Sequence, residues 1–150
     1  MTMKNEFATE YAQELVIRNI YDTAKANNEE SGKELARTMI RELGESIEAK
    51  GRNYARVYEY YKETKDRKND LIFIDECVFE DKAEELIEAF KECGITEFVY
   101  SSTWSGAMNI VWLFTTLGCQ VAGMVEFNGR CQGFMSDEYE KAHGLLIKIN

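Results

Sequence analysis

The polar segment from residue 101 to residue 105 is the part of this sequence best suited to bind a small ligand. It follows a predicted strand and opens a predicted helix, so backbone N–H groups and hydroxyls would converge at a helix N-terminus, which favours anions. Two acidic residues at the end of the preceding predicted strand would reach the same edge if the strands are parallel. The residues of this predicted anion or nucleotide site are Asp75, Glu76, Ser101, Ser102, Thr103, Trp104 and Ser105.

The same segment has a structural interpretation that is compatible with the first. Ser102 or Thr103 would cap the helix, and Trp104 would pack over it. The chain has no standard phosphate loop. A nucleophile elbow with Ser105 as its central serine would require glycine two residues earlier, where Thr103 stands. The sequence therefore predicts no catalytic residue. Whether the chain is an enzyme stays open, with a non-enzymatic protein favoured.

Metal and cofactor sites find no support in the histidine and cysteine spacing. His143 is the only histidine, and the cysteines form no Cys-x-x-Cys pair, so we expect reduced thiols and neither a metal nor a cofactor. The four cysteines are Cys77, Cys93, Cys119 and Cys131.

A predicted helix over residues 79–93 concentrates negative charge on its outer face. We interpret this face either as an ordinary solvated surface or as an imitation of nucleic-acid phosphates that would occupy the basic channel of a nucleic-acid enzyme. Weak metal binding is disfavoured because helical spacing spreads the carboxylates. The acidic residues are Glu80, Asp81, Glu84, Glu85, Glu88 and Glu92.

The net charge of −9 is distributed unevenly along the chain. Residues 1–70 hold 13 Lys and Arg against 14 Asp and Glu, whereas residues 71–150 hold 5 against 13. The acidic second half disfavours direct nucleic-acid binding and suits a basic protein partner, or simply keeps the domain soluble. Lys33, Arg37 and Arg41 align on one helix face but have glutamates at pairing distance, so we expect a solvent-exposed face there.

Residues 98–125 contain no charged side chain, yet they do not predict a membrane span. Polar residues and glycines interrupt the stretch, and its apolar helical part is about 12 residues, short of the roughly 20 that a bilayer requires. We expect a buried element instead: a helix over 105–117, apolar all round, sandwiched between a sheet and the N-terminal helices. The start of the chain also lacks a leader-like apolar run, which predicts a cytoplasmic protein.

The hydrophobic pattern predicts an α/β fold, with α+β as the alternative, in one domain with a helical subregion (1–70) and an α/β subregion (71–150). Three N-terminal helices would pack on a small β-α-β-α-β-β mixed sheet with right-handed crossovers and a mainly parallel core. Asn128–Gly129 predicts a hairpin turn, and residues 137–142 a short helical piece. The predicted helices span 5–26, 30–49, 52–65, 79–93 and 105–117, and the strands span 71–75, 97–101, 119–127 and 144–149.

Tyr54, Tyr58 and Tyr61 share one face of the third predicted helix. Aromatic residues at this spacing indicate core or interface, so the face could also hold a homo-oligomer together.

Residues 19–72, ECGITEFVYSSTWS (92–105), GCQVAGMVEFN (118–128) and EKAHG (140–144) resemble an uncharacterised family of short proteins encoded by phages and mobile elements of gut Firmicutes. The resemblance carries over no site residues. It implies a protein in the cytoplasm of a bacterial host that inhibits host defence, as anti-CRISPR proteins do. The leading hypothesis is thus a non-enzymatic protein that binds a host protein such as a CRISPR-Cas nuclease. The alternative is a small α/β ligand-binding or hydrolytic domain that uses Ser101–Ser105.

Overall fold

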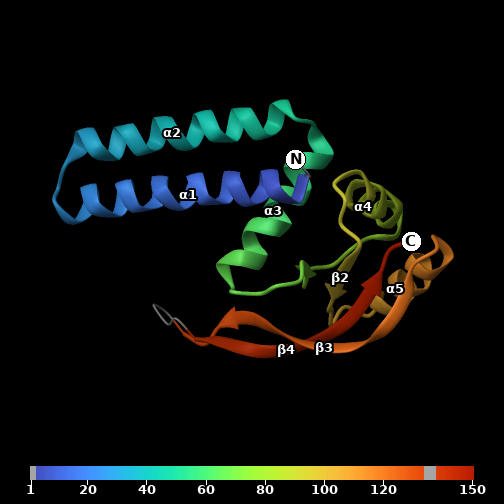
Figure 1. The fold of residues 1–150 in the computed structure, drawn as a ribbon. Coiled ribbons are helices and arrows are strands. Elements are labelled where there is room, and N and C mark those ends of the chain that lie inside the picture. Colours follow the sequence, from blue (N-terminus) through green and yellow to red (C-terminus); the bar gives the residue numbers. More distant parts are fainter. Residues whose placement is uncertain (1–2, 134–137) are drawn as a thin grey trace. The chain divides into compact units, whose positions relative to one another are not determined.

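The computed structural model describes residues 3–133 and 138–150, and within them it has five helices and a four-stranded mixed sheet (Figure 1). It is an α+β fold, and the predicted order of helices and strands is confirmed. The chain divides into two compact units, Met1–Ala55 and Arg56–Asn150, and the boundary falls inside helix α3 (Arg52–Asp66). Among the described residues, no helix combines the length and apolar character needed to cross a bilayer.

The first unit is a helical hairpin of α1 (Met3–Ala26) and α2 (Glu30–Ala49). Asn28 adopts a left-handed conformation (φ 54°), and the Glu29 N–H donates to the Ala24 carbonyl at 2.8 Å, which ends α1 where the sequence predicts a break. The backbones of the two helices approach closely here. A Cβ atom on Gly32 would lie only 2.7 Å from the Cβ of Ala24, so a larger residue would not fit without a shift.

The second unit is built on a sheet with the strand order β1-β2-β4-β3. Among the described strands, β1 and β2 pair in parallel, whereas β4 pairs antiparallel with both β2 and β3. The predicted mainly parallel core is therefore wrong, because β4 inserts between β2 and β3. The strands are β1 (Phe73–Ile74), β2 (Glu97–Tyr100), β3 (Gln120–Cys131) and β4 (Tyr139–Lys148).

The β3 and β4 strands form a long curved hairpin, which the sequence places incorrectly (Figure 1). Asn128 and Gly129 lie within β3, where Asn128 pairs with Lys141, so the predicted turn at this dipeptide is wrong. The predicted helical piece is also wrong from Tyr139 onward, because β4 begins there, and Asp137 lies outside the described residues. The physical reason is that the Asn128 side chain is engaged in tertiary hydrogen bonds rather than in a turn.

Helices α4 (Glu80–Glu92) and α5 (Ala107–Thr116) cover one face of the sheet through aromatic contacts. The ring of Phe98 in β2 lies 5.0 Å from that of Phe90 in α4 and 5.4 Å from that of Phe114 in α5. Tyr100, two residues along and therefore on the same face, lies 5.5 Å from Phe114. All four side chains are buried, so this layer is the aromatic core of the unit.

The prediction that α5 is buried on two sides is wrong. Ile110 and Phe114 are fully buried against the sheet, whereas Met108 and Trp112 are 77% and 68% exposed. The helix is apolar on both faces, but only one face is covered in the chain. The tyrosine face of α3, by contrast, is internal: Tyr54, Tyr58 and Tyr61 are all buried.

Candidate functional site

A cavity of about 420 Å³ lies between α3 and the β1 strand and its following turn. Its volume falls in the range of small-molecule sites. Its lining combines charged side chains with two buried residues of β1, Phe73 and Ile74. The lining residues are Arg56, Glu59, Tyr60, Glu63, Arg67, Phe73, Ile74, Asp75 and Glu76.

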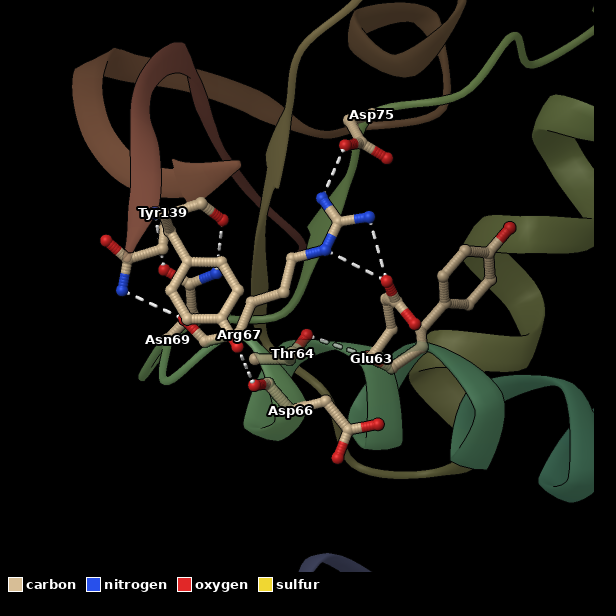
Figure 2. Close-up of polar contacts among 9 residues, drawn as sticks. Glu63, Thr64, Asp66, Arg67, Asn69, Asp75 and Tyr139 are labelled. Atoms are coloured by element: carbon tan, nitrogen blue, oxygen red, sulfur yellow. Dashed lines mark hydrogen bonds and ion pairs between the residues drawn. The ribbon is translucent and has the colours of Figure 1, made fainter. Parts of the chain in front are cut away.

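Arg67, one of the lining residues, contacts both Glu63 and Asp75 (Figure 2). Its Nε and Nη2 atoms lie 2.9 and 2.8 Å from Oε1 of Glu63, and its Nη1 lies 2.8 Å from Oδ2 of Asp75. The guanidinium also stacks 4.8 Å from the centre of the Phe73 ring. Burial opposes its charge, but the hydrogen bonds and charges of Asp75 and Glu63 outweigh burial and raise the pKa of Arg67. Arg67 is thus held as a fixed cation.

Tyr60 and Glu76 form the second polar contact of the cavity. The Tyr60 hydroxyl donates to Oε1 of Glu76 at 2.7 Å, and its ring lies 5.9 Å from that of Phe90. Burial, followed by this hydrogen bond and the charge of Glu76, raises the pKa of Tyr60 to about 12. The phenol therefore stays a proton donor at physiological pH and fixes the Glu76 carboxylate.

The charge of the lining decides which ligands the cavity suits. It has four carboxylates and two guanidinium groups, and Arg67 is already paired with two of the carboxylates. An anion would face a surplus of negative charge here, whereas an ammonium or guanidinium group would be favoured. The cavity is thus chemically opposite to the anion site predicted at residues 101–105, although two of the residues expected beside that site, Asp75 and Glu76, line it.

The predicted site residues lie close in the sheet but do not converge on one cavity. Asp75 and Ser101 follow paired parallel strands, and the Ser101 N–H donates to the Ile74 carbonyl at 2.9 Å. Asp75 and Glu76 nevertheless have their carboxylates bound by Arg67 and Tyr60 of α3. The lining of the cavity includes no residue of the 101–105 segment.

The hydroxyls of the 101–105 segment have local partners. Ser101 donates from Oγ to the His143 carbonyl at 2.8 Å, and Ser102 Oγ accepts from the Trp104 N–H at 3.1 Å. The predicted cap is wrong, because α5 begins at Ala107 after Gly106 and no side chain caps it. Trp104 packs on Gly106, the N-cap residue of α5, where a Cβ would lie 2.4 Å from the indole ring.

The acidic residues of α4 are placed as the sequence predicts, with all six exposed. At 3.6 residues per turn they cover an arc of about 140° opposite the buried stripe. Lys82 pairs with Glu85 at 3.6 Å at one margin of the arc, and Lys91 lies at the other margin. We call the outer surface formed by Glu80, Asp81, Glu84, Glu85, Glu88 and Glu92 the acidic face.

Sequence reasoning missed the contribution of α3 to the cavity. Arg56, Glu59 or Tyr60, Glu63 and Arg67 recur at three- and four-residue intervals, a spacing that places them on one helix face. That periodicity was the available signal. The pairing of Arg67 with Asp75 depends on how α3 meets β1, which no local pattern contains.

The comparisons with known proteins match this division of the chain. The model of a family described as Domain of unknown function (DUF7698) matches residues 56–149, nearly the same bounds as the second compact unit, Arg56–Asn150. No curated protein and no solved structure matches the chain. Because the family match covers well over half of the sequence, the chain belongs to the DUF7698 family.

Proposed function

We propose that the protein is a non-enzymatic inhibitor that binds a host-defence protein through the acidic face of α4. The observation that carries the proposal is the exposure of six carboxylates on one side of a helix whose other side is buried in the core. Such a face is held rigidly by the domain and needs no rearrangement to meet a basic surface. The family domain, residues 56–149, supports this with 10 Lys and Arg against 17 Asp and Glu, a net charge of −7.

The mean charge density of the acidic face supports mimicry of a nucleic-acid strand. Glu80 and Glu92 are about 18 Å apart along the helix axis at 1.5 Å per residue, so the six carboxylates are spaced by a mean of about 3.6 Å, in uneven steps of about 1.5 to 6 Å. The phosphates of one DNA strand follow at about 3.4 Å along theirs. The partner favoured by the resemblance to phage and mobile-element proteins is the basic nucleic-acid channel of a CRISPR-Cas nuclease.

Inhibition of DNA cleavage by a Cas9-type nuclease loaded with guide RNA tests the proposal. The full chain should bind the complex, and binding should weaken steeply as salt concentration rises. Replacing Glu84, Glu85 and Glu88 together by Lys should reduce affinity by roughly a hundredfold or more, because close interfacial charge pairs couple by about 1.5–7 kcal/mol each.

The matched control makes the same charge change on another helix. Glu42, Glu45 and Glu48 are exposed on α2, outside the family domain, so their replacement by Lys adds the same six units of charge. The control variant should keep most of the affinity. Equal losses of affinity in the two variants would show that only the net charge of the protein matters. Absence of binding to guide-loaded nucleases would overturn this choice of partner.

A ligand-binding domain is the second candidate function, and the 420 Å³ cavity favours it. The lining suits a cationic ligand, so spermidine or arginine should raise the midpoint of thermal unfolding, whereas inorganic phosphate should not. Asp75→Asn should abolish the shift while Ser102→Ala should not. A shift with phosphate that Ser102→Ala removes would instead favour the 101–105 segment, and no shift with any of the three would leave the cavity as a structural void.

A further inference from the structure

An aromatic pair lies at the start of the acidic face. The ring of Phe79, which is 58% exposed, lies 5.7 Å from that of Trp104 in an edge-to-face arrangement. Phe79 follows β1 and Trp104 follows β2, and because these strands pair in parallel, both segments leave the same edge of the sheet. We call Phe79 and Trp104 the aromatic pair. The ring contact makes them one surface, and the chain continues directly from Phe79 into Glu80 and Asp81 of the acidic face.

Phe79 occupies a position that usually has a polar side chain. It is the N-cap residue of α4, where Ser, Thr, Asp and Asn are favoured because their side chains accept a backbone N–H. A phenylalanine cannot do so, and no side chain caps α4. Its ring is not part of the core either, since more than half of the residue is exposed. The residue therefore serves neither capping nor the core, and the exposed part of its ring is available to another molecule.

The ring of Trp104 is held in place by its own segment. The Trp104 N–H donates to Ser102 Oγ at 3.1 Å, and its carbonyl accepts from the Ala107 N–H at 3.0 Å. Its indole packs so closely on Gly106 that a Cβ there would lie 2.4 Å away. The support for the Phe79 ring is thus ordered before any partner arrives, which lowers the entropy cost of binding.

Charge restricts the occupant of the aromatic pair to a cation. From residue 69 to residue 81 the chain carries five acidic residues and neither Lys nor Arg. The second ring belongs to residues 98–125, which carry no charge at all. Lys82, the next base along the chain, pairs with Glu85 at 3.6 Å. A cation is therefore attracted both by the adjoining carboxylates and by the negative faces of the rings, whereas an anion is repelled.

A contact within the same domain shows which cation such a surface accommodates. Arg67 holds its guanidinium 4.8 Å from the centre of the Phe73 ring. At the same time its N–H groups bond to the carboxylates of Glu63 and Asp75. A guanidinium is planar, so it can lie on a ring and direct its N–H groups to carboxylates, whereas an ammonium is a compact and strongly hydrated charge. The same combination of ring and carboxylates is exposed at Phe79.

We propose that the aromatic pair binds an arginine side chain of the basic partner, with the guanidinium on the Phe79 ring and its N–H groups directed to Glu80 and Asp81. The arginine fixes one end of the partner segment at the start of α4, and the other carboxylates of the acidic face attract its remaining bases. This inference rests on the proposed function, because it takes the acidic face as the surface that the partner meets. It adds the side chain that is recognised there.

Calorimetric titration of the full chain with nona-arginine and with nona-lysine tests the proposal. The two peptides carry equal numbers of basic side chains, so a surface that recognises charge alone binds them similarly. The wild type should bind nona-arginine about tenfold more tightly. Phe79→Leu keeps an apolar side chain but removes the ring. It should raise the dissociation constant of nona-arginine about tenfold, or about 1.4 kcal/mol, within the range of a cation–π contact, and that of nona-lysine by no more than about twofold.

Trp112→Leu is the matched control, because it removes an aromatic ring that is exposed on α5 within the uncharged segment. It should change the affinity for neither peptide, and circular dichroism spectra should show that both variants are folded. It also leaves Trp104 as the only tryptophan. In this variant nona-arginine should change the fluorescence emission of Trp104, with the dissociation constant found by calorimetry. Unchanged emission on binding would overturn the inference.

The remaining outcomes separate this inference from the proposed function. Equal affinities of the two peptides, or equal losses in Phe79→Leu and Trp112→Leu, would overturn the inference. If replacing Glu84, Glu85 and Glu88 by Lys then still abolished binding, the acidic face would stand without the aromatic pair. Ring-dependent binding of nona-arginine, without binding to a guide-loaded nuclease, would support the aromatic pair and overturn the choice of partner. Failure of both peptides to bind would overturn the inference together with the affinity of the acidic face for basic partners.

Discussion

The two faces of the sheet are held by different kinds of interaction. On the face covered by α4 and α5, the rings of Phe90, Phe98, Tyr100 and Phe114 form a continuous buried layer. The other face has a cluster of Phe73, Val99 and Phe127, and polar contacts lie beside it. Buried aromatic rings contribute much stability but do not require exact positions, whereas hydrogen bonds are directional. We therefore expect the aromatic face to supply most of the stability and the polar face to fix the register of the strands.

The polar face joins three segments that are distant in sequence. Asn69 donates to the Asn128 carbonyl at 2.9 Å and accepts from its N–H at 2.8 Å. The Asn128 side chain donates in turn to the Arg67 carbonyl at 2.9 Å, and the Tyr139 hydroxyl donates to the Asp66 carbonyl at 2.7 Å (Figure 2). The end of α3 is thereby fixed to both strands of the long hairpin, which also positions Arg67 in the cavity.

Truncation of Phe98 is the most severe test of this comparison. Phe98→Ala removes a fully buried ring that contacts both covering helices, and it should lower the free energy of unfolding by about 3–5 kcal/mol. Trp112→Ala, on the exposed side of α5, should change it by no more than about 0.5 kcal/mol. Urea denaturation followed by circular dichroism measures both. Similar losses would contradict the division into a buried and an open side of α5.

Removal of the Asn128 side chain should have a smaller but more local effect. Asn128→Ala leaves the carbonyls of Arg67 and Lys68 without their side-chain donor and should cost about 1–3 kcal/mol. Hydrogen exchange should quicken first at residues 67–69 and in the outer half of the hairpin. Asn109→Ala, at an exposed position of α5, is the control and should change neither. A uniform rise in exchange across the aromatic face would show that the polar face does not act separately.

The ends of the helices show how far the sequence could be interpreted. Gly94 and Gly118 predict the ends of α4 and α5, and both adopt left-handed conformations with φ of 75° and 94°. Lys68 occupies the same position after α3 with φ 59°, and the Asn69 N–H donates to the Thr64 carbonyl at 2.9 Å. The lysine itself gives no local signal for this turn. The turn is held in part by tertiary hydrogen bonds from the Asn128 side chain to the carbonyls of Arg67 and Lys68.

The incorrect predictions also arise from tertiary contacts. Apolarity on every side of α5 predicts two buried faces, but periodicity cannot distinguish a surface covered within the chain from one left exposed. Asn128–Gly129 has the composition of a turn, yet Asn128 is a tertiary hydrogen-bonding residue. Of the candidate site, Asp75 and the acidic face were identifiable from the sequence because each follows a local pattern. The partner of Asp75, Arg67, was not, because their pairing is set by the packing of α3 on β1.

Tyr60 takes part in both kinds of interaction, and its titration gives the smallest predicted effect. Its ring contacts Phe90 of the aromatic layer, while its hydroxyl donates to Glu76. Because the folded state raises the pKa of Tyr60 to about 12, it binds the phenol proton more tightly than the unfolded chain does. The resulting stability is complete below the usual tyrosine pKa of about 10 and is lost as pH rises from there towards 12.

Tyr60→Phe should therefore reduce the slope of unfolding free energy against pH between about 10 and 12, measured by urea denaturation at several pH values. Part of the slope should persist, because burial also raises the pKa of Tyr61 and Tyr100. Glu76→Gln should reduce the slope less than Tyr60→Phe, since burial contributes more to the shift than Glu76 does. Equal slopes in the wild type and Tyr60→Phe would mean that the phenol is solvated. The contact between α3 and the aromatic layer would then be looser than the ring geometry implies.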